Sequence, residues 1–270
     1  MSALAFEKWQ GLGNDFLVVC GDDPGPELAM RLCDRRRGVG GDGVLAITEE
    51  PTGVRMIVRN ADGSRPEMCG NGVRCVVGSV ARARGLERGD LVVLSDAGPR
   101  RCAFERAADG SYRVSVSMGT ARLEGPILLP EAEGRDFVRV DMGNPHAVSF
   151  APFVDADLDR VGPALERATP GGINVELCRF VRPRHIEVVV WERGCGRTQA
   201  CGTGACAVVA AAIDAGLVAA GESVEVSLPG GKLAIVVSPR SFEVTMSGPA
   251  ALAFVGEAPS TPARAWTRQP

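Results

Sequence analysis

A four-residue motif that opens an apolar helical pattern occurs twice in this chain. The first copy is Cys69-Gly70-Asn71-Gly72, and the second is Cys201-Gly202-Thr203-Gly204. Each copy follows an apolar run typical of a strand and precedes a run of small apolar residues typical of a helix. The repeat therefore restricts the fold. We expect two domains with the same plan, each with a cysteine at the start of a helix.

A cysteine at the start of a helix has a particular electrostatic environment. The first N–H groups of a helix are unpaired, and the positive end of the helix dipole lies beside them. Such a position binds anions and lowers the pKa of a nearby thiol. We therefore expect two such helix starts, facing each other, to bind a carboxylate.

The length and the composition fit two ordinary domains. The chain has 270 residues, and 45% of them are apolar, which is enough for a packed core in each domain. We predict a first domain at residues 1–117 and a second at 118–252, with a linker around residues 118–126. The segment from about 253 to 270 is expected to return to the first domain.

Charge and hydropathy exclude several classes of protein. The formal net charge is -3 and the arginines are scattered, so nucleic acid is not an expected partner. No apolar run approaches the roughly 18 residues that span a bilayer, so no membrane contact is expected. Glu7 and Lys8 lie where a signal peptide needs its apolar stretch, which predicts a cytoplasmic protein. Nine cysteines cannot all pair, and a reducing compartment would keep them as thiols.

Helical patterns occur in four places. One extends from residue 26 to about 37, with proline near its start, arginines in its last turn and a glycine after it. A second follows Cys69 and ends at Gly85, and the others are expected near residues 163–167 and 205–213. Three arginines of the second helix are predicted to lie off its apolar face: Arg74, Arg82 and Arg84.

Short apolar runs predict strands in both halves of the chain. The sequence Pro229-Gly230-Gly231 between two alternating runs, residues 224–228 and 233–237, predicts a closing hairpin. The remaining strands are expected near residues 16–19, 44–47, 54–58, 91–94, 114–117, 137–140, 147–150, 175–180 and 186–191.

Two familiar sites are not expected. The segment Gly38-Val39-Gly40-Gly41-Asp42-Gly43 matches G-x-G-x-x-G, but dinucleotide binding needs a strand before the pattern and a helix after it. Here a helix precedes and a β-type run follows, so we expect a loop. Zinc is not expected, because the cysteines lack C-x2-C spacing and the chain has two histidines. Six further cysteines are interpreted as buried packing residues: Cys20, Cys33, Cys75, Cys102, Cys178 and Cys206.

Two kinds of chemistry fit the repeated cysteines. A cysteine hydrolase needs one thiol, a histidine base and an oxyanion pocket; His146 can serve as the base, but the second thiol then has no task. Inversion of a stereocentre needs one group to remove a proton from one face and another to add a proton to the opposite face. Two thiols meet that need near neutral pH. Neither Lys8 nor Lys232 lies in a recognisable pyridoxal phosphate site, which favours a route without a cofactor.

The chain resembles a known family, the diaminopimelate epimerases, in a series of motifs that occur in the same order as in the family. The motifs cover residues 11–206, and the closing strands also fit. They are Gly11-Leu12-Gly13-Asn14-Asp15-Phe16, Asn60-Ala61-Asp62-Gly63-Ser64, Met68-Cys69-Gly70-Asn71-Gly72, Gly143-Asn144-Pro145-His146, Gly172-Ile173-Asn174, Glu192-Arg193-Gly194 and Ala200-Cys201-Gly202-Thr203-Gly204.

The resemblance implies a fold and a reaction. The fold is α+β, with two pseudo-symmetric domains that each have a mostly antiparallel curved sheet or barrel around a central helix, and the active site lies in the cleft between them. The reaction interconverts LL-diaminopimelate and meso-diaminopimelate for lysine and peptidoglycan biosynthesis, with no metal and no cofactor. A homodimer is also implied. A related two-cysteine racemase of another amino acid is the first alternative, and a Cys-His hydrolase is the second.

The resemblance also implies a role for each motif residue. Cys69 and Cys201 correspond to the acid and the base on opposite faces of the reacting carbon. Glu192 and the backbone of Arg193 hold the reacting ammonium group, and His146 helps to poise the site. Residues at the two helix starts receive the reacting carboxylate: Gly70, Asn71, Gly202 and Thr203. The distal amino-acid group is bound by Asn14, Asn60, Asn144, Asn174 and the Arg193 side chain.

The chain departs from the family pattern at two positions. Gly43 stands where some members have a glutamine that faces the substrate, which removes one side-chain contact. Cys195 occupies a variable loop position, six residues before Cys201. We expect that oxidation can join Cys195 or Cys69 to Cys201 in an inactivating disulfide, a hypothesis that thiol mapping after oxidation tests.

Overall fold

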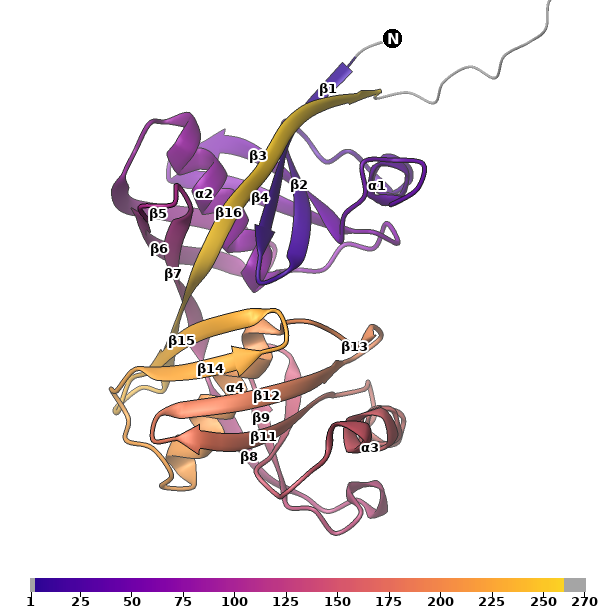
Figure 1. The fold of residues 1–270 in the computed structure, drawn as a ribbon, viewed down its shortest axis with the longest axis vertical. Coiled ribbons are helices and arrows are strands. Elements are labelled where there is room, and N and C mark those ends of the chain that lie inside the picture. Colours follow the sequence, from indigo (N-terminus) through magenta and orange to yellow (C-terminus); the bar gives the residue numbers. More distant parts are fainter. Residues whose placement is uncertain (1–2, 260–270) are drawn as a thin grey trace, which may run out of the picture. The chain divides into compact units, whose positions relative to one another are not determined.

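The computed structural model describes residues 3–259, which form two compact units (Figure 1). Unit 1 extends to Tyr112 and resumes at Ala250, and unit 2 is Arg113–Pro249. Strand β16 (Glu243–Pro259) begins in unit 2 and ends in unit 1. Of the segment expected to return to the first domain, residues 260–270 lie outside the described residues. None of the helices in the described part of the chain has the length and apolar character needed to cross a membrane.

Unit 1 has a curved sheet around one central helix. Strands pair antiparallel within each of the hairpins β1–β2, β3–β4 and β5–β6, whereas β2–β3 and β4–β5 are parallel. Helix α2 contacts all six of these strands, and most of its residues are buried. The elements are β1 (Ala3–Gly11), β2 (Asn14–Cys20), α1 (Pro26–Cys33), β3 (Gly43–Glu50), β4 (Gly53–Asn60), α2 (Gly70–Ala83), β5 (Arg88–Ser95) and β6 (Gly98–Arg106).

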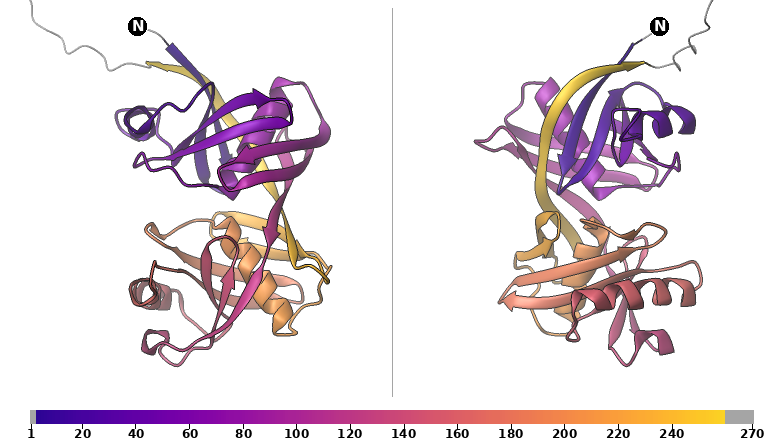
Figure 2. Two further views of the ribbon diagram at one scale, coloured as in Figure 1. Left: turned by 180° about the vertical axis from the view of Figure 1, so that it is seen from behind. Right: turned by 45° about the vertical axis from the view of Figure 1, so that its right-hand side comes forward.

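Unit 2 repeats this plan. Its central helix α4 contacts β9, β10, β11 and β15, and Figure 2 shows strands of the same unit around each central helix. The predicted α+β class with two pseudo-symmetric units is confirmed. The elements are β7 (Tyr112–Thr120), β8 (Arg122–Ile127), η1 (Pro130–Ala132), β9 (Phe137–Asp141), β10 (Pro145–Ser149), α3 (Asp155–Ala168), β11 (Asn174–Arg182), β12 (His185–Glu192), β13 (Gly196–Arg197), α4 (Gly202–Asp214), β14 (Val224–Leu228) and β15 (Gly231–Val237).

The order of elements gives a residue-by-residue correspondence between the units. The series β1, β2, α1, β3, β4, α2 matches β9, β10, α3, β11, β12, α4. In unit 1, β2 runs parallel to β3 with Phe16 opposite Gly43. In unit 2, β10 runs parallel to β11 with His146 opposite Asn174. Phe16 therefore corresponds to His146, and Gly43 to Asn174.

The segment predicted as a linker, residues 118–126, forms strands instead. It belongs to β7 and β8. Val114, Val116 and Met118 point to one side of β7 and are fully buried, so this strand contributes to a core. The alternation of apolar and polar residues through this segment was the sequence signal for a strand.

Helix α1 is shorter than predicted, because it ends at Cys33. The carboxylate of Asp34 accepts the N–H groups of Arg36 (2.8 Å) and Arg37 (2.9 Å), and this turn competes with a further turn of helix. The arginines expected in the last turn therefore lie beyond the helix. Gly38 packs on the helix end, where a Cβ atom would lie 2.1 Å from the carbonyl oxygen of Arg31. Residues 38–42 of the G-x-G-x-x-G segment form a loop, as predicted, and Gly43 begins β3.

Helix α3 is longer than predicted, because it begins eight residues before Pro163. The carboxylate of Asp157 accepts the N–H of Val154 (2.9 Å) at the N-terminus. Leu158, Val161 and Leu165 are buried on one face, and this spacing extends the helix upstream of the proline. Pro163 is tolerated inside the helix, although proline was interpreted as its start.

Two further predictions are wrong at single residues. Arg74, which was predicted to lie off the apolar face of α2, is fully buried, because strands enclose this helix. Cys20 is exposed, whereas Cys33, Cys75, Cys102, Cys178 and Cys206 are buried as predicted. The predicted hairpin is confirmed, since Leu228 pairs with Gly231 across a two-residue turn.

Candidate active site

Both repeated cysteines are the N-cap residues of central helices. Cys69 precedes α2 with φ -138° and ψ 112°, and Cys201 precedes α4 with φ -116° and ψ 111°. In each case a backbone N–H three residues later, of Gly72 or Gly204, donates to Sγ at 3.4 Å. This hydrogen bond favours the thiolate over the thiol. The predicted helix starts are confirmed, and the repeat in sequence is a repeat in geometry.

In unit 1 a chain of hydrogen bonds leads away from α2. Nη2 of Arg74 donates to Oδ1 of Asn71 (2.9 Å). Nδ2 of Asn71 donates to Oδ1 of Asn14 (3.2 Å), and Nδ2 of Asn14 donates to Oδ2 of Asp42 (2.6 Å). Because a guanidinium only donates and a carboxylate only accepts, both amide orientations are fixed. We call these four residues the Asn14 chain; it brings Asn14 and Asn71 together.

An ionic cluster supports the loop that carries Asp42. Asp15 lies 2.7 Å from Nζ of Lys8 and 2.6 Å from Nη2 of Arg35, and Arg35 also lies 2.8 Å from Asp42. Lys8 is buried and donates to the carbonyl of Gly40. Burial raises the pKa of Asp15, but hydrogen bonds from Arg35 and Lys8 outweigh it and hold this pKa at about 2.

The loop between Asn60 and Cys69 begins with a tight turn. Nδ2 of Asn60 donates to the hydroxyl of Ser64 (2.9 Å), and its backbone N–H donates to the carbonyl of Ser64 (2.9 Å). In this structure the Asn60 amide therefore holds its own loop.

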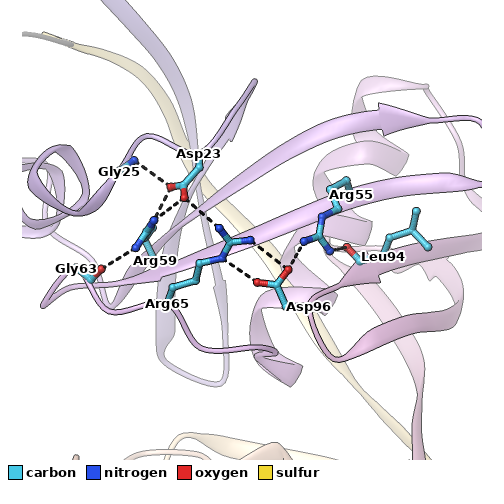
Figure 3. A network of polar contacts seen from close by, with 8 residues as sticks. All are labelled: Asp23, Gly25, Arg55, Arg59, Gly63, Arg65, Leu94 and Asp96. Carbon is cyan, nitrogen blue, oxygen red and sulfur yellow. Dashed lines mark hydrogen bonds and ion pairs between the residues drawn. The ribbon is translucent and has the colours of Figure 1, made fainter.

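Arginines and aspartates tie this loop to the neighbouring strands (Figure 3). Arg65 lies between two carboxylates, with Nε 2.8 Å from Asp96 and Nη1 3.5 Å from Asp23. Arg59 makes a bidentate pair with Asp23, at 2.9 and 2.5 Å. Arg55 pairs with Asp96 from the other side. The network fixes the path of the chain toward Cys69.

In unit 2 a different chain of hydrogen bonds leads to the cysteine. Oγ1 of Thr203 lies 3.5 Å from Sγ of Cys201 and accepts from Nδ2 of Asn144 (3.3 Å). Oδ1 of Asn144 lies 3.1 Å from Nε2 of His146. Nδ1 of His146 lies 2.7 Å from Oε1 of Glu176. We call these five residues the Cys201 chain. Both ring nitrogens of His146 are engaged within it.

Asn174 and Glu192 lie at the ends of neighbouring strands in unit 2. Nδ2 of Asn174 donates to the carbonyl of Pro145 (2.9 Å), and its Oδ1 accepts the backbone N–H of Arg193 (3.0 Å). The carboxylate of Glu192 accepts a hydrogen bond from the hydroxyl of Thr198. The structure thus links Thr203, Asn144 and His146 to Cys201, and it joins Asn174 to the backbone of Arg193, whose side chain donates to the carbonyl of Gly171 (3.0 Å).

The predicted lowering of the thiol pKa is wrong for Cys201. Burial raises this pKa well above its ordinary value, and the nearby carboxyl groups of Glu192 and Glu176 raise it further. Hydrogen bonds from Thr203 and Gly204 lower it but do not compensate. Cys201 is only 4% exposed, whereas Cys69 is partly exposed, so the two thiols have different environments.

Glu176 and Asp42 were missed in the sequence. Glu176 lies two residues after Asn174 on β11, so both side chains share a face of the sheet. A carboxylate inside an otherwise apolar run was the available signal. Asp42 lies in the glycine-rich loop, which was considered only as a possible dinucleotide-binding motif.

The two departures from the family pattern have structural settings. A Cβ atom at Gly43 would lie 2.6 Å from the carbonyl oxygen of Arg59, so a side chain here would require the strand pairing to shift. Cys195 is exposed, in a turn where its N–H donates to the carbonyl of Glu192 (3.0 Å). All nine cysteines are free thiols.

Comparison with known proteins agrees with this arrangement. A family model described as diaminopimelate epimerase matches residues 6–124 and 138–253. The chain belongs to the diaminopimelate epimerase family. The diaminopimelate epimerase of Desulforudis audaxviator is 45% identical over 280 residues, which cover 94% of this chain and 99% of that one. The chloroplastic enzyme of Oryza sativa subsp. japonica is 38% identical, with 95% and 80% covered.

Solved structures share the fold of this epimerase family member at low identity. A predicted epimerase from Pseudomonas aeruginosa superposes with a TM-score of 0.75 at 17% identity, covering 94% of this chain and 99% of that one. A hydroxyproline epimerase from Agrobacterium vitis superposes with a TM-score of 0.73 at 12% identity, covering 96% and 91%. At these identities the likeness concerns the fold alone.

Proposed function

We propose that this chain is a diaminopimelate epimerase that interconverts the LL and meso forms by a two-base mechanism without a cofactor. The observation that carries the proposal is the repeated N-cap cysteine, with the same backbone conformation and the same N–H to Sγ hydrogen bond in both units. Family membership supports the substrate.

In the proposed reaction, Cys69 and Cys201 act on opposite faces of the α carbon. One thiolate removes the α proton, and the thiol on the other face supplies a proton, so the configuration inverts. The N–H groups at the starts of α2 and α4 stabilise the negative charge on the reacting carboxylate. These are contributed by Gly70, Asn71, Gly202 and Thr203.

The remaining site residues are proposed to bind the two ammonium groups and the distal carboxylate. Glu192 and the carbonyl of Arg193 hold the reacting ammonium group, and His146 poises the site. The distal end, which is itself an amino acid, suits amides because they both donate and accept. The proposed distal residues are Asn14, Asn60, Asn144, Asn174 and the Arg193 side chain. We further propose a cytoplasmic homodimer, which light scattering of the purified chain tests.

The test is conversion of a defined substrate. Reduced protein without added cofactor is incubated with LL-diaminopimelate, and the meso isomer is separated and quantified. Formation of the meso isomer, with none of the corresponding conversion of L-proline or trans-4-hydroxy-L-proline, supports the proposal. Conversion of a proline substrate alone, or of none, contradicts it.

A further inference from the structure

A buried carboxyl group packs against the first turn of α4. Glu176 is fully buried, and a Cβ atom at Gly204 would lie 2.6 Å from its Oε1. At the same place in unit 1, a Cβ atom at Gly72 would lie 3.0 Å from Cδ2 of Leu45. Leucine therefore fills this position where only packing is needed, and the carboxyl of Glu176 calls for a chemical explanation.

The Cys201 chain has a direction. Nδ2 of Asn144 donates to Thr203, so the carbonyl oxygen of the same amide faces Nε2 of His146. An amide oxygen only accepts, so Nε2 must carry a hydrogen. Since the Thr203 oxygen already accepts from Asn144, its own hydrogen is free to point to the sulfur 3.5 Å away.

The other ring nitrogen then needs a second hydrogen. Nδ1 of His146 lies 2.7 Å from Oε1 of Glu176, and one proton must lie between these two atoms. Burial raises the pKa of Glu176, in keeping with a carboxyl group that shares a proton. Its Oε2 is buried, and no hydrogen bond reaches it from the described residues. A full carboxylate charge would leave that oxygen unpaired at considerable cost.

We propose that Glu176 is a positioning residue that keeps a proton on Nε2 of His146 and so directs the Cys201 chain toward the sulfur. A reversed chain would have a bare Nε2, a flipped Asn144 amide and a Thr203 hydroxyl turned away from the sulfur. The forward chain adds a hydroxyl hydrogen bond that stabilises the thiolate when Cys201 acts as the base. Its role in catalysis rests on the proposed epimerase function, whereas the direction of the chain does not.

Other titratable groups also act on this pair. The charge of Glu192 raises the pKa of Glu176, and Glu176 in turn raises the pKa of the Cys178 and Cys201 thiols. A measurement on His146 itself is therefore needed to separate the direction of the chain from the general charge of the site.

The direct test is nitrogen NMR of the histidine rings in tag-free protein. The chain has two histidines, His146 and His185, and a His185→Gln variant assigns the signals. His185 lies in the same unit but does not belong to the Cys201 chain, because its Nε2 is 2.8 Å from the Ser227 hydroxyl. We expect a protonated Nε2 on His146 from pH 6 to 8. A neutral ring with a bare Nε2 overturns the proposal, whatever the substrate.

Two substitutions of Glu176 separate direction from charge. Glutamine can donate from its amide to Nδ1, so in Glu176→Gln the ring proton stays on Nε2, and we expect kcat close to that of the parent. In Glu176→Leu, which copies Leu45, Nδ1 has no partner and kcat should fall roughly tenfold, as expected when a buried polar partner is removed. Equal losses in both variants would show that the charge matters and would overturn the proposal.

A double-mutant cycle tests whether Glu176 acts through the chain. Thr203→Val removes the hydroxyl donor, and Thr203→Ser keeps it. Because the effect of Glu176→Leu should pass through that hydroxyl, the double variant Glu176→Leu/Thr203→Val should be little worse than Thr203→Val alone. Additive losses contradict the proposal. Circular dichroism confirms that each variant is folded, and the ring signals in Glu176→Leu report its tautomer even if the protein has no epimerase activity.

Discussion

The start of α2 in unit 1 and the start of α4 in unit 2 have the same cysteine, the same backbone and the same sulfur hydrogen bond, but different surroundings. In unit 1, Leu45 packs against Gly72 of α2 and Phe16 takes the strand position of His146, and both residues are apolar and buried. Below α4 the corresponding residues are Glu176 and His146, a buried polar pair. The shared backbone places a thiol at each helix start, and the different neighbouring side chains give the two thiols different environments.

Followed from donor to acceptor, the two hydrogen-bonded chains also run in opposite directions. The Asn14 chain begins at Arg74 on the helix and ends on a carboxylate in a loop. The Cys201 chain begins at a strand and ends at the sulfur. In an epimerase each thiol must act as acid for one isomer and as base for the other, so an unequal pair sets different energies for the two protonation states. Burial and the neighbouring carboxyl groups raise the pKa of the Cys201 thiol, whereas Cys69 is partly exposed.

Replacement of the repeated cysteines should have the largest effect. Cys69→Ala and Cys201→Ala should each reduce epimerisation on the order of 100-fold or more, because each thiol is needed on its own face. The matched controls are Cys75→Ala and Cys206→Ala, which remove buried thiols farther along the same helices. These should cost about 1 kcal/mol of stability and leave activity near that of the parent. Full activity in either N-cap variant contradicts the two-base reading.

A carboxylate below α2 should be strongly destabilising. Leu45→Glu places an acid where no histidine faces it, and an uncompensated buried charge costs more than about 3 kcal/mol. Adding Phe16→His, which restores the partner found in unit 2, should recover part of the loss. Urea unfolding of both variants measures this. No recovery in the double variant would refute the correspondence of Phe16 with His146.

The glycines at the third helical position should differ in their tolerance of alanine. At Gly204 a Cβ atom meets a Glu176 carboxyl oxygen at 2.6 Å, and overpacking of this kind costs about 1–3 kcal/mol. At Gly72 a Cβ atom meets a Leu45 methyl at 3.0 Å, which can shift, and the helix preference for alanine offsets about 1 kcal/mol. In thermal unfolding, Gly204→Ala should therefore have a lower midpoint temperature than Gly72→Ala. Equal stabilities would contradict the described difference.

The ionic cluster of unit 1 should make the free energy of unfolding depend on pH in the acid range. The pKa of Asp15 is held at about 2, below its ordinary 3.8, so this carboxylate stabilises the fold above about pH 4 and ceases to do so as pH falls toward 2. With allowance for solvent screening, we expect a contribution of about 1–2 kcal/mol. The stability difference between the parent and Asp15→Asn should shrink over that range. Asp90→Asn, at an exposed position of the same unit, is the control variant.

The network of Figure 3 should have the smallest effect. Arg65→Ala releases the loop before Cys69 from Asp23 and Asp96, and partly exposed ion pairs of this kind contribute less than about 1 kcal/mol. We expect KM to rise less than about fivefold and kcat to stay near the parental value. Arg106→Ala, which breaks a surface pair with Glu87 at 2.8 Å, is the control and should leave KM unchanged. A large loss of kcat would show that the loop does more than carry Cys69.

The sequence predicted what depends on local pattern. The repeated motif predicted both helix starts, and alternation predicted the strands. Predictions were wrong where a nonlocal contact or a local competitor decided the outcome. Asp34 ended α1 early, Pro163 was tolerated inside α3, and enclosure by strands buried Arg74.

The chemical difference between the two cysteines was also beyond the sequence pattern. The CGxG motifs are nearly identical, and the tuning groups come from other strands. Glu176 reaches Cys201 through three intervening residues, and burial of that thiol results from packing of the whole unit. A helix start alone predicted a lowered thiol pKa, whereas burial and two carboxylates raise it at Cys201.

The central claim is that two thiols act on opposite faces of one carbon, and deuterium transfer tests it most directly. LL-diaminopimelate is converted in heavy water, the reaction is stopped at low conversion, and the α positions of product and recovered substrate are examined by proton NMR. The account predicts meso product with α-deuterium, while recovered substrate keeps its α-hydrogen. Meso product that retains the original α-hydrogen would show that one group serves both faces and would contradict the account.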